Sequence, residues 1–256
     1  MIHQRCEIVS RFNIHKFKTI RIAYSSELEN ADLFITGFKG YGAVGYIATL
    51  HLADTAECKE AGYIITKYMP EAVTPSSNGV VGPFTLYSCN NNGKRIALLV
   101  NHDIPVVQER SRFAEAIVDF LATIGVKEAV LIGGFDSRFK QGDEKLRWVA
   151  TSAYTRSLEE PRMDKGLYVV GPLALLLFHA EVRGYPALAV LPYTEAARPD
   201  PRAAAAAIEK INELYGLKFS IDELLEQARK IEEMITMMEQ QQRDMLTPPS
   251  SERAYM

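Results

Sequence analysis

Residues 40–45, Gly-Tyr-Gly-Ala-Val-Gly, are the first candidate for chemistry, because their spacing fits the dinucleotide-binding pattern G-x-G-x-x-G. In that pattern the glycines let backbone amides at a helix N-terminus approach a pyrophosphate. A dinucleotide site also needs an acidic residue near the end of the following strand, to bind the ribose hydroxyls. Here the strand ends at Thr66-Lys67-Tyr68, and the nearest acid, Glu71, lies beyond Pro70. Tight packing between strand and helix accounts for the glycines without a nucleotide.

A smaller anion site is the alternative for the same glycine run. Lys39 directly precedes Gly40 and lies close to Gly42. A cation beside a helix N-terminus suits a phosphate group. We therefore keep Lys39, Gly40 and Gly42 as candidate anion ligands.

Two other loops carry polar side chains directly after predicted strands. Asn101-His102-Asp103 follows one strand, and Asp136-Ser137-Arg138 follows another. Open α/β sheets bind ligands beyond the carboxyl ends of their strands, so one hypothesis is an enzyme that uses Lys39, His102 and Asp136 around a phosphate. The sequence contains no G-x-S-x-G elbow, no metal-spaced histidine pair and no cysteine–histidine nucleophile pattern. No motif specifies an enzyme, and no cofactor or metal is expected.

The last residues of the chain carry chemistry of another kind. Ala254-Tyr255-Met256 places a penultimate tyrosine beside a terminal carboxylate, after the polar segment 247–253. Pro248 and Pro249 cannot continue a helix, so the tail is expected to leave the body as an extended, mobile strand. A partner protein can capture such a carboxylate with a lysine or with backbone amides. A frayed terminus without function is the alternative.

The elements that must position these residues alternate between strands and helices. The sequence predicts strands at 17–24, 32–38, 62–68, 84–89, 95–100, 128–134 and 187–192, and helices at 44–56, 108–124, 172–183 and 200–215. This alternation predicts an α/β protein, a three-layer α/β/α sandwich with a mostly parallel sheet. Asn92-Gly93 predicts a hairpin turn between two of the strands.

A long C-terminal helix is predicted at 220–246, where Ser220 and Glu223 form a capping box. Apolar residues then recur at heptad a and d spacing over about 25 residues, or roughly 37 Å of helix. These positions are Ile221, Leu224, Ala228, Ile231, Ile235, Met238, Gln242 and Met245. The seam favours contact between subunits through Leu224, Ala228, Ile231, Ile235 and Met238. A helix packed on its own domain is the alternative.

Composition limits the possible partners and compartments. The 256 residues carry a formal net charge of −3, which gives no support for a surface that binds nucleic acid or an anionic membrane. No apolar run reaches the roughly 18 residues of a membrane span, and the N-terminus lacks the apolar core of a signal peptide. Cys6, Cys58 and Cys89 are odd in number and widely spaced, which suggests neither a disulfide framework nor a zinc site. A cytoplasmic protein with reduced cysteines is expected.

Four segments together resemble the proteasome-assembling chaperone family, especially its archaeal homologue of type B. They are 33–52, 120–134, 171–191, and 200–204 with the helix that follows. They cover most of residues 30–245, and their order is more specific than any single motif. Lys39 departs from the pattern, because the family's glycine run usually has proline there.

The resemblance implies a sandwich similar to nucleoside phosphorylases that does not act as an enzyme. It implies an ATP-independent assembly chaperone or activator. The protein is then a homo-oligomer, expected to be a tetramer, whose tails dock between α-subunits of the core proteasome. The docking motif is hydrophobic–Tyr–any residue, so Ala254 is the hydrophobic position, Tyr255 the tyrosine and Met256 the carboxylate bearer. Ala254 is smaller than the residue usually found there.

The predicted organisation is a core at 1–199, a helical segment at 200–246 and a tail at 247–256. Two alternatives remain for the function. One is the phosphate- or nucleoside-binding enzyme, and the other is a scaffold that binds other chaperone homologues through its long helix.

Overall fold

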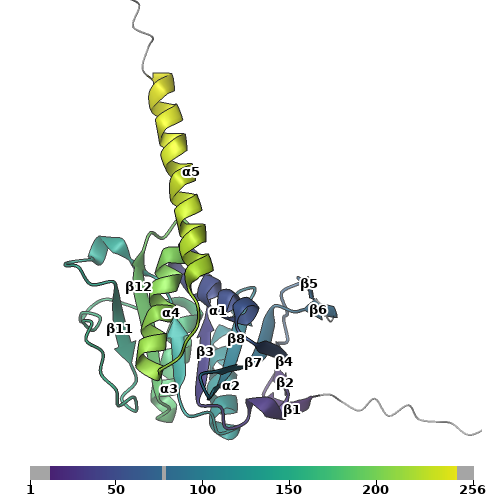
Figure 1. Ribbon diagram of the computed structural model, residues 1–256. Helices are drawn as coiled ribbons and strands as arrows, with labels where there is room; N and C mark the ends of the chain where they lie inside the picture. Colours follow the sequence, from purple (N-terminus) through teal and green to yellow (C-terminus); the bar gives the residue numbers. More distant parts are fainter. Residues whose placement is uncertain (1–11, 77–78, 247–256) are drawn as a thin grey trace, which may run out of the picture.

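A ten-stranded sheet forms the centre of the molecule (Figure 1). The computed structural model describes residues 12–76 and 79–246, with side chains described as far as Gln241 except that of Glu239. The strand order is β1-β2-β4-β7-β8-β3-β9-β12-β10, and β11 also pairs with β12. A separate two-stranded hairpin, β5 with β6, lies beside the sheet.

The strands of the main sheet are β1 (Asn13–Phe17), β2 (Ile20–Tyr24), β3 (Leu33–Gly37), β4 (Cys58–Ile65), β7 (Phe84–Asn91), β8 (Lys94–Asn101), β9 (Ala129–Ile132), β10 (Phe135–Asp136), β11 (Leu146–Ala150) and β12 (Ala187–Thr194). The small hairpin consists of β5 (Thr74–Ser76) and β6 (Gly79–Val81). The helices are α1 (Val44–Thr55), α2 (Arg110–Thr123), α3 (Gly171–Arg183), α4 (Pro201–Tyr215) and α5 (Asp222–Leu246).

The sheet is mixed, so the expectation of a mostly parallel sheet is wrong. The parallel pairs are β8–β3, β3–β9, β9–β12 and β12–β10. The antiparallel pairs are β1–β2, β2–β4, β4–β7, β7–β8 and β11–β12. Parallel pairs need a long crossover connection, whereas antiparallel strands can be joined by a tight turn. The β7–β8 turn is the predicted one, since Asn92 and Gly93 have φ values of 46° and 79°.

The predicted strand 17–24 is also divided in two. Lys18 has a φ of 53°, a left-handed conformation that turns the chain back on itself. β1 and β2 therefore pair as an antiparallel hairpin at the edge of the sheet. No glycine, proline or asparagine marks this turn in the sequence.

Helices cover both faces of the sheet. α2 and α3 pack together on one face, in a core that includes Phe113, Phe120 and Leu176. α1 and α4 pack together on the other, in a core that includes Leu52 and Ile208. The predicted layering of helix, sheet and helix is confirmed in this respect.

The ends of α4 are those that its local sequence predicts. The Asp200 carboxylate accepts a hydrogen bond of 2.9 Å from the Ala203 amide, and Pro201 is the first helical residue. Gly216, with a φ of 64°, ends the helix in the left-handed conformation that glycine adopts easily. α3 ends in the same way at Gly184.

A disulfide joins Cys58 of β4 to Cys89 of β7, so the expectation of reduced cysteines is wrong for this pair. The two residues are directly opposite each other in the antiparallel register, and their Cα atoms are 4.2 Å apart. Their separation of 31 residues hides this proximity in the sequence. Cys6 lies outside the described residues.

No helix in the described part of the chain is a candidate for a membrane span. None of the helices within residues 12–76 and 79–246 combines the length and apolar character that a membrane span needs.

Candidate functional site

The base of α5 is anchored in the body of the protein. Leu224 and Ala228 are 1% and 3% exposed, and both are buried within the chain on the side of α1 and α4. Farther along α5, the Arg202 guanidinium donates hydrogen bonds of 2.9 Å to both carboxylate oxygens of Glu232. The two predicted seam residues nearest the base therefore already have intramolecular partners.

The N-terminus of α5 differs in detail from the predicted capping box. The Ser220 hydroxyl accepts a hydrogen bond of 3.2 Å from the Asp222 amide and donates one of 3.0 Å to the Asp222 carboxylate. Asp222, rather than the predicted Glu223, is thus the acid that Ser220 contacts. The Ser220 carbonyl lies 2.8 Å from Nε2 of His51 on α1, which holds this loop against the body.

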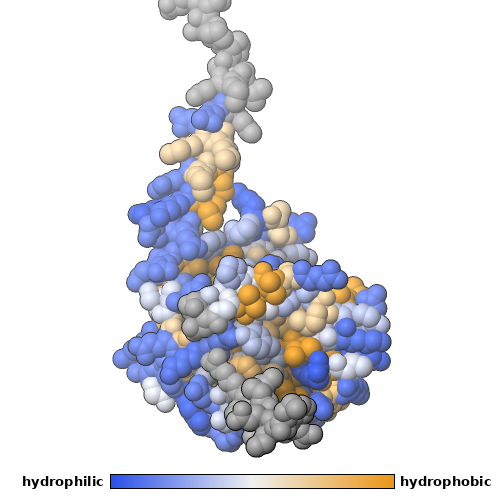
Figure 2. Space-filling view, turned by 90° about the vertical axis from the view of Figure 1, so that its right-hand side faces the viewer, coloured by the Kyte–Doolittle hydropathy of each residue, from blue (hydrophilic) through white to orange (hydrophobic). Residues whose placement is uncertain are grey.

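The second half of α5 projects away from the body (Figure 1). Ile231 and Ile235 are half-buried, whereas Met238 and its neighbours Met234 and Met237 are more than half exposed. Figure 2 shows hydrophobic atoms along one side of the projecting helix and hydrophilic atoms along the other. The part of the seam that is open to a partner therefore begins near Ile231. The side chains of Gln242 and Met245 lie outside the described set.

The predicted docking residues Ala254, Tyr255 and Met256 also lie outside the described residues. They belong to the ten residues that follow the last residue of α5, Leu246. Their role remains a prediction.

The predicted anion ligands Lys39, Gly40 and Gly42 have groups that already make hydrogen bonds within the protein. The Lys39 ammonium donates a hydrogen bond of 2.6 Å to the His102 carbonyl and lies 4.5 Å from the centre of the Tyr46 ring. The Gly40 amide binds the Phe38 carbonyl. The Gly42 carbonyl accepts from the Asp200 amide at 2.9 Å. Each of the three residues is thus hydrogen-bonded within the loop or to a neighbouring segment.

The glycines at the ends of this run allow close packing, as the sequence predicts. A Cβ atom on Gly37 would overlap the backbone of Gly45, and one on Gly45 would overlap the carbonyl oxygen of Ile132. Gly42 has a φ of 59°, and a Cβ there would overlap the side chain of Thr194. The strand β3 and the start of α1 therefore approach each other too closely for any larger residue.

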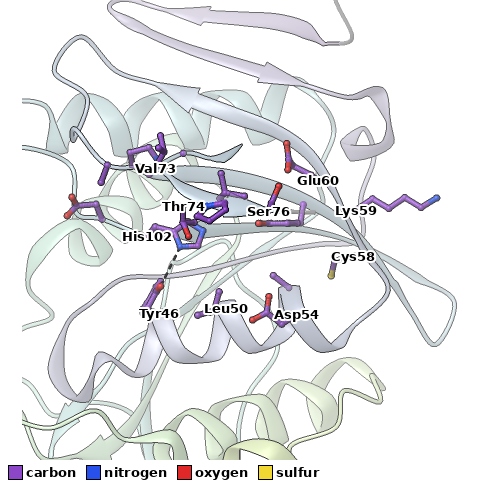
Figure 3. A pocket seen from close by; sticks show the side chains of 18 residues that line it. Tyr46, Leu50, Asp54, Cys58, Lys59, Glu60, Val73, Thr74, Ser76 and His102 are labelled. Carbon is purple, nitrogen blue, oxygen red and sulfur yellow. Dashed lines mark hydrogen bonds between the residues drawn. The ribbon is translucent and has the colours of Figure 1, made fainter. Parts of the chain in front are cut away.

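A polar cavity of about 880 Å³ lies between α1, β4 and the β5–β6 hairpin (Figure 3). Tyr46, Leu50 and Asp54 of α1 form one side, and His102 lies at the end of β8. Nδ1 of His102 is 3.4 Å from the Tyr46 hydroxyl. Nε2 of the same ring is buried and has no hydrogen-bond partner among the described residues.

Burial controls the charge of this cavity. It lowers the pKa of His102, with a further contribution from the nearby Lys39 charge, so the imidazole is neutral at neutral pH. Burial also raises the pKa of Asp54, and it raises the pKa of Tyr87 to about 12. A neutral histidine beside a tyrosine could exchange a proton with a ligand.

The residues of the hypothetical enzyme are divided between two cavities. His102 lines the polar cavity, whereas Lys39 and Asp136 line a second one. Asp136 is held by Arg138, whose guanidinium donates to both carboxylate oxygens over 2.6–3.0 Å. These hydrogen bonds lower the pKa of Asp136 and keep it charged. The geometry therefore gives no support to a joint role for the three.

The second cavity has a volume of about 560 Å³ and lies beyond the carboxyl ends of β3 and β9. Its outer wall is the segment 163–173, which leads into α3. Before Gly171 and the predicted helix at 172–183, residues 163–170 of this segment were not predicted to form a strand, a helix or a site. The sequence of these residues shows no regular alternation of apolar and polar residues that would have indicated a strand or a helix.

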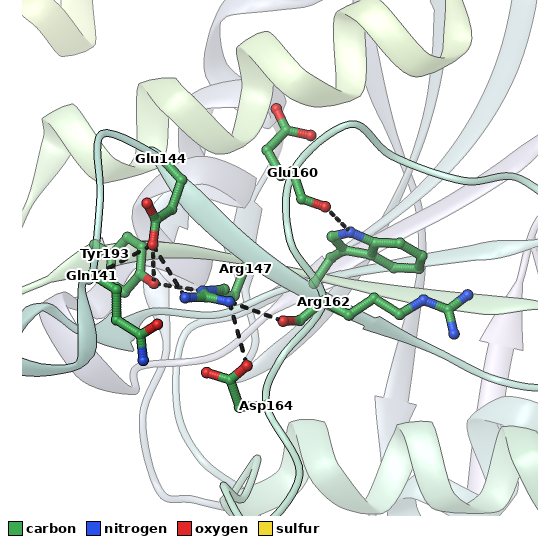
Figure 4. Close-up of polar contacts among 8 residues, drawn as sticks. Gln141, Glu144, Arg147, Glu160, Arg162, Asp164 and Tyr193 are labelled. Atoms are coloured by element: carbon green, nitrogen blue, oxygen red, sulfur yellow. Dashed lines mark hydrogen bonds and ion pairs between the residues drawn. The ribbon is translucent and has the colours of Figure 1, made fainter.

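A buried arginine fixes that outer wall (Figure 4). Arg147 of β11 is 5% exposed and donates hydrogen bonds to the Tyr193 hydroxyl at 2.7 Å and to the Arg162 carbonyl at 3.2 Å. It also forms ion pairs with Glu144 and Asp164, over 3.2 Å and 3.6 Å. The backbone before Met163 is therefore tied to the sheet at several points.

Metal binding has no obvious place in the described residues. Over residues 12–76 and 79–246, no three His, Cys, Asp or Glu side chains form a group that could hold a metal ion.

Comparisons with known proteins found a family model that matches this chain and solved structures with a similar fold. The model of the PAC2 family matches residues 34–239. The chain is 26% identical to the protein MJ1210 of Methanocaldococcus jannaschii over 249 residues, which is 93% of this chain and 96% of the relative. The match therefore extends over nearly the whole of both chains.

Two solved structures from Pyrococcus furiosus have the same fold. PbaA, an archaeal homologue of a proteasome-assembly chaperone, is 26% identical with a TM-score of 0.74, over 89% of this chain and 94% of PbaA. PbaB, an archaeal proteasome activator, is 22% identical with a TM-score of 0.73, over 87% of this chain and 100% of PbaB. The likeness to PbaB is one of fold.

Proposed function

The chain belongs to the PAC2 family, and on this premise we propose that it binds the core proteasome as an assembly chaperone or as an ATP-independent activator, through a C-terminal tail that ends in Ala254-Tyr255-Met256. The predicted resemblance to the proteasome-assembling chaperones is confirmed at the level of the family. PbaA and PbaB supply the direction of the proposal, since one is a chaperone homologue and the other an activator.

The observation that carries the proposal is that α5 has a base buried in the body and a second half that projects from it. The buried residues of the base are Leu224 and Ala228. The eleven residues after Ile235 add about 16 Å of helix. The ten residues after Leu246 can add at most about 35 Å. A fixed helix that carries a tail is suited to reach a pocket on a large partner.

Docking would use the chemistry of the tail. In a chain that ends at Met256, the terminal carboxylate pairs with a lysine of the pocket, while the Tyr255 ring packs against the rim and its hydroxyl finds an acceptor. Ala254 buries little apolar surface, so one tail binds weakly. Several tails on one oligomer compensate through effective concentration, provided that their spacing matches that of the pockets.

The open part of the seam would supply the oligomer. Ile231, Ile235 and Met238 fall on one stripe of α5 and are half-buried or exposed. Replacing Ile231 and Ile235 together with lysine is expected to dissociate the oligomer, as measured by light scattering after gel filtration. Thr236→Lys with Gln240→Lys is the matched control, because it adds the same charge at exposed positions outside the stripe. An unchanged mass in the seam variant would reject this interface.

The test of docking uses purified archaeal core proteasome and four forms of the protein. They are the full chain, a chain that ends at Arg253, Tyr255→Ala, and a chain extended by Gly-Ser-Gly after Met256. The extension keeps every side chain and moves the carboxylate. We expect binding by the full chain alone, and a peptide-hydrolysis assay then distinguishes an activator, which accelerates cleavage, from a chaperone. Binding by the form that ends at Arg253 would refute the tail mechanism.

A further inference from the structure

We infer that the cavity beyond β3 and β9 is a small-molecule site, which binds an organic monoanion whose apolar body fills it. This inference does not depend on proteasome binding. It rests on the size and position of the cavity, on its lining, and on the charges at its edge.

Position and size both fit a ligand site. The cavity lies where β3, β9 and β12, which run parallel, reach their carboxyl ends. Ligands of α/β sheets bind in that place. The volume of about 560 Å³ is within the range of roughly 300–1,000 Å³ that small-molecule sites occupy.

The lining is largely apolar and partly aromatic. It includes Phe38, Phe135, Phe139, Leu167, Leu173 and Leu191. Tyr168 lies at the same cavity and is 83% exposed. Gly40 also faces open space there, because a Cβ on it would meet nothing within 4 Å. The apolar portion of a ligand can therefore be buried without displacing a side chain.

Two cations at the cavity have no acidic partner. Lys39 uses one ammonium hydrogen for the His102 carbonyl. Arg110 donates through Nε to the Pro105 carbonyl at 2.9 Å. Neither is ion-paired with a carboxylate among the described residues, so each retains donors for an anion.

The carboxylate at the cavity, that of Asp136, does not repel an anionic ligand. Both oxygens of Asp136 are occupied by Arg138, which balances the charge. The remaining charge at the site is therefore that of Lys39 and Arg110. Buried aromatic surface next to unpaired cations favours an anionic ligand with an apolar body.

The anion is better matched by a carboxylate than by a phosphate. A phosphate site would present several free backbone amides. Here the Gly40 amide binds the Phe38 carbonyl, and the Ala43 amide binds the Gly40 carbonyl. A guanidinium and an ammonium suffice for a single negative charge.

The wall of the cavity is preorganised. The Arg147 network holds the Arg162 carbonyl and Asp164 at the start of the wall. The Met163 amide donates to the Trp148 carbonyl at 2.9 Å, and the Arg162 guanidinium lies 4.5 Å from the Trp148 ring centre. Binding at a preformed site loses little free energy to ordering.

The test uses a fluorescent probe, anilinonaphthalene sulfonate, with its uncharged analogue N-phenylnaphthylamine. Competitors are 3-phenylpropionate, its amide of nearly equal shape, and inorganic phosphate. We expect the sulfonate to bind with enhanced fluorescence, and 3-phenylpropionate to displace it at least about 5-fold more effectively than the amide. Phosphate is expected to displace it little. Equal displacement by acid and amide would overturn the anion requirement.

Variants locate the probe. Lys39→Met and Arg110→Met keep the aliphatic stem, and each is expected to weaken sulfonate binding about 5-fold while N-phenylnaphthylamine binding stays within about 2-fold. Lys140→Met is the matched control at an exposed lysine that does not line the cavity. A loss in the control as large as in Lys39→Met would show non-specific attraction and overturn the site.

A filling variant tests the cavity itself. Gly40→Phe is expected to reduce binding of both probes, because Gly40 lines the cavity and a Cβ on it would meet nothing within 4 Å. Far-ultraviolet circular dichroism confirms that the variant is folded. Unchanged binding by folded Gly40→Phe would place the probe elsewhere and refute the proposal. The comparison of acid with amide on the unaltered protein decides the anion requirement in any case.

Discussion

Burial of Leu224, rather than the ion pair between Arg202 and Glu232, is expected to fix α5 to the body. Leu224 is 1% exposed, and truncation of such a leucine to alanine costs about 2–5 kcal/mol. The side chains of Arg202 and Glu232 are each 56% exposed, and exposed pairs of this kind contribute about 0–1 kcal/mol. The two contributions therefore differ enough to be separated by measurement.

The test compares Leu224→Ala, Arg202→Met and Leu225→Ala. Leu225 is the adjacent leucine, 37% exposed, so it controls for the change in composition at this end of α5. Urea unfolding measures the free energy of unfolding of each variant, and hydrogen exchange of the peptide 222–235 measures local opening. Leu224→Ala is expected to lose about 3 kcal/mol and to exchange roughly 100-fold faster, since 1.4 kcal/mol is a factor of ten.

Two results would refute the reasoning. One is an acceleration of exchange in Arg202→Met as large as in Leu224→Ala, which would make the ion pair the anchor. The other is an equal loss in Leu225→Ala, which would mean that α5 does not bury one defined face. Either result would also remove the fixed base on which the proposed reach of the tail depends.

Three further predictions concern the body. Replacing Cys58 and Cys89 together with serine is expected to lower the free energy of unfolding by about 3–4 kcal/mol, because the disulfide closes a separation of 31 residues; urea unfolding measures this, and reductant should then have no further effect on the variant. The hydrogen bond from Lys127 lowers the pKa of Asp32, so Asp32 stabilises the fold above about pH 4 and this stability is lost as the pH falls through its lowered pKa. The stability difference between wild type and Asp32→Asn should therefore be present at pH 7 and shrink below about pH 4 in urea titrations. Gly45→Ala is expected to cost about 2–4 kcal/mol, because the added Cβ would overlap a carbonyl oxygen of β9; a melting temperature equal to that of wild type would contradict this close approach.

Local signals in the sequence predicted the helices well. α4 begins and ends where an aspartate, a proline and a glycine indicate, because these residues act on the backbone next to them. The Asn92-Gly93 turn is local in the same sense. The close packing of the glycine run was also predicted, since only glycine tolerates it.

Features that depend on distant residues were missed. The antiparallel half of the sheet and the Cys58–Cys89 disulfide both result from strand register, which no local pattern encodes. The turn at Lys18 lacks the residues that usually mark one. The ligand cavity depends on a wall held by Arg147 across the fold, and an isolated arginine in a strand carries no such information.

Because one half of α5 is anchored and the other half projects, the length of the helix sets the distance between the body and the end of α5. An insertion of seven residues after Ile235 would move the end of the helix outward by about 10.5 Å and turn it by only about 20°. An insertion of three or four residues would move the end by about half as much, and would shift Met238 relative to Ile231 out of their common stripe. Insertions in α5 can therefore change the distance and the direction of the helix end without a change in the body. Insertions of whole heptads change mainly the distance.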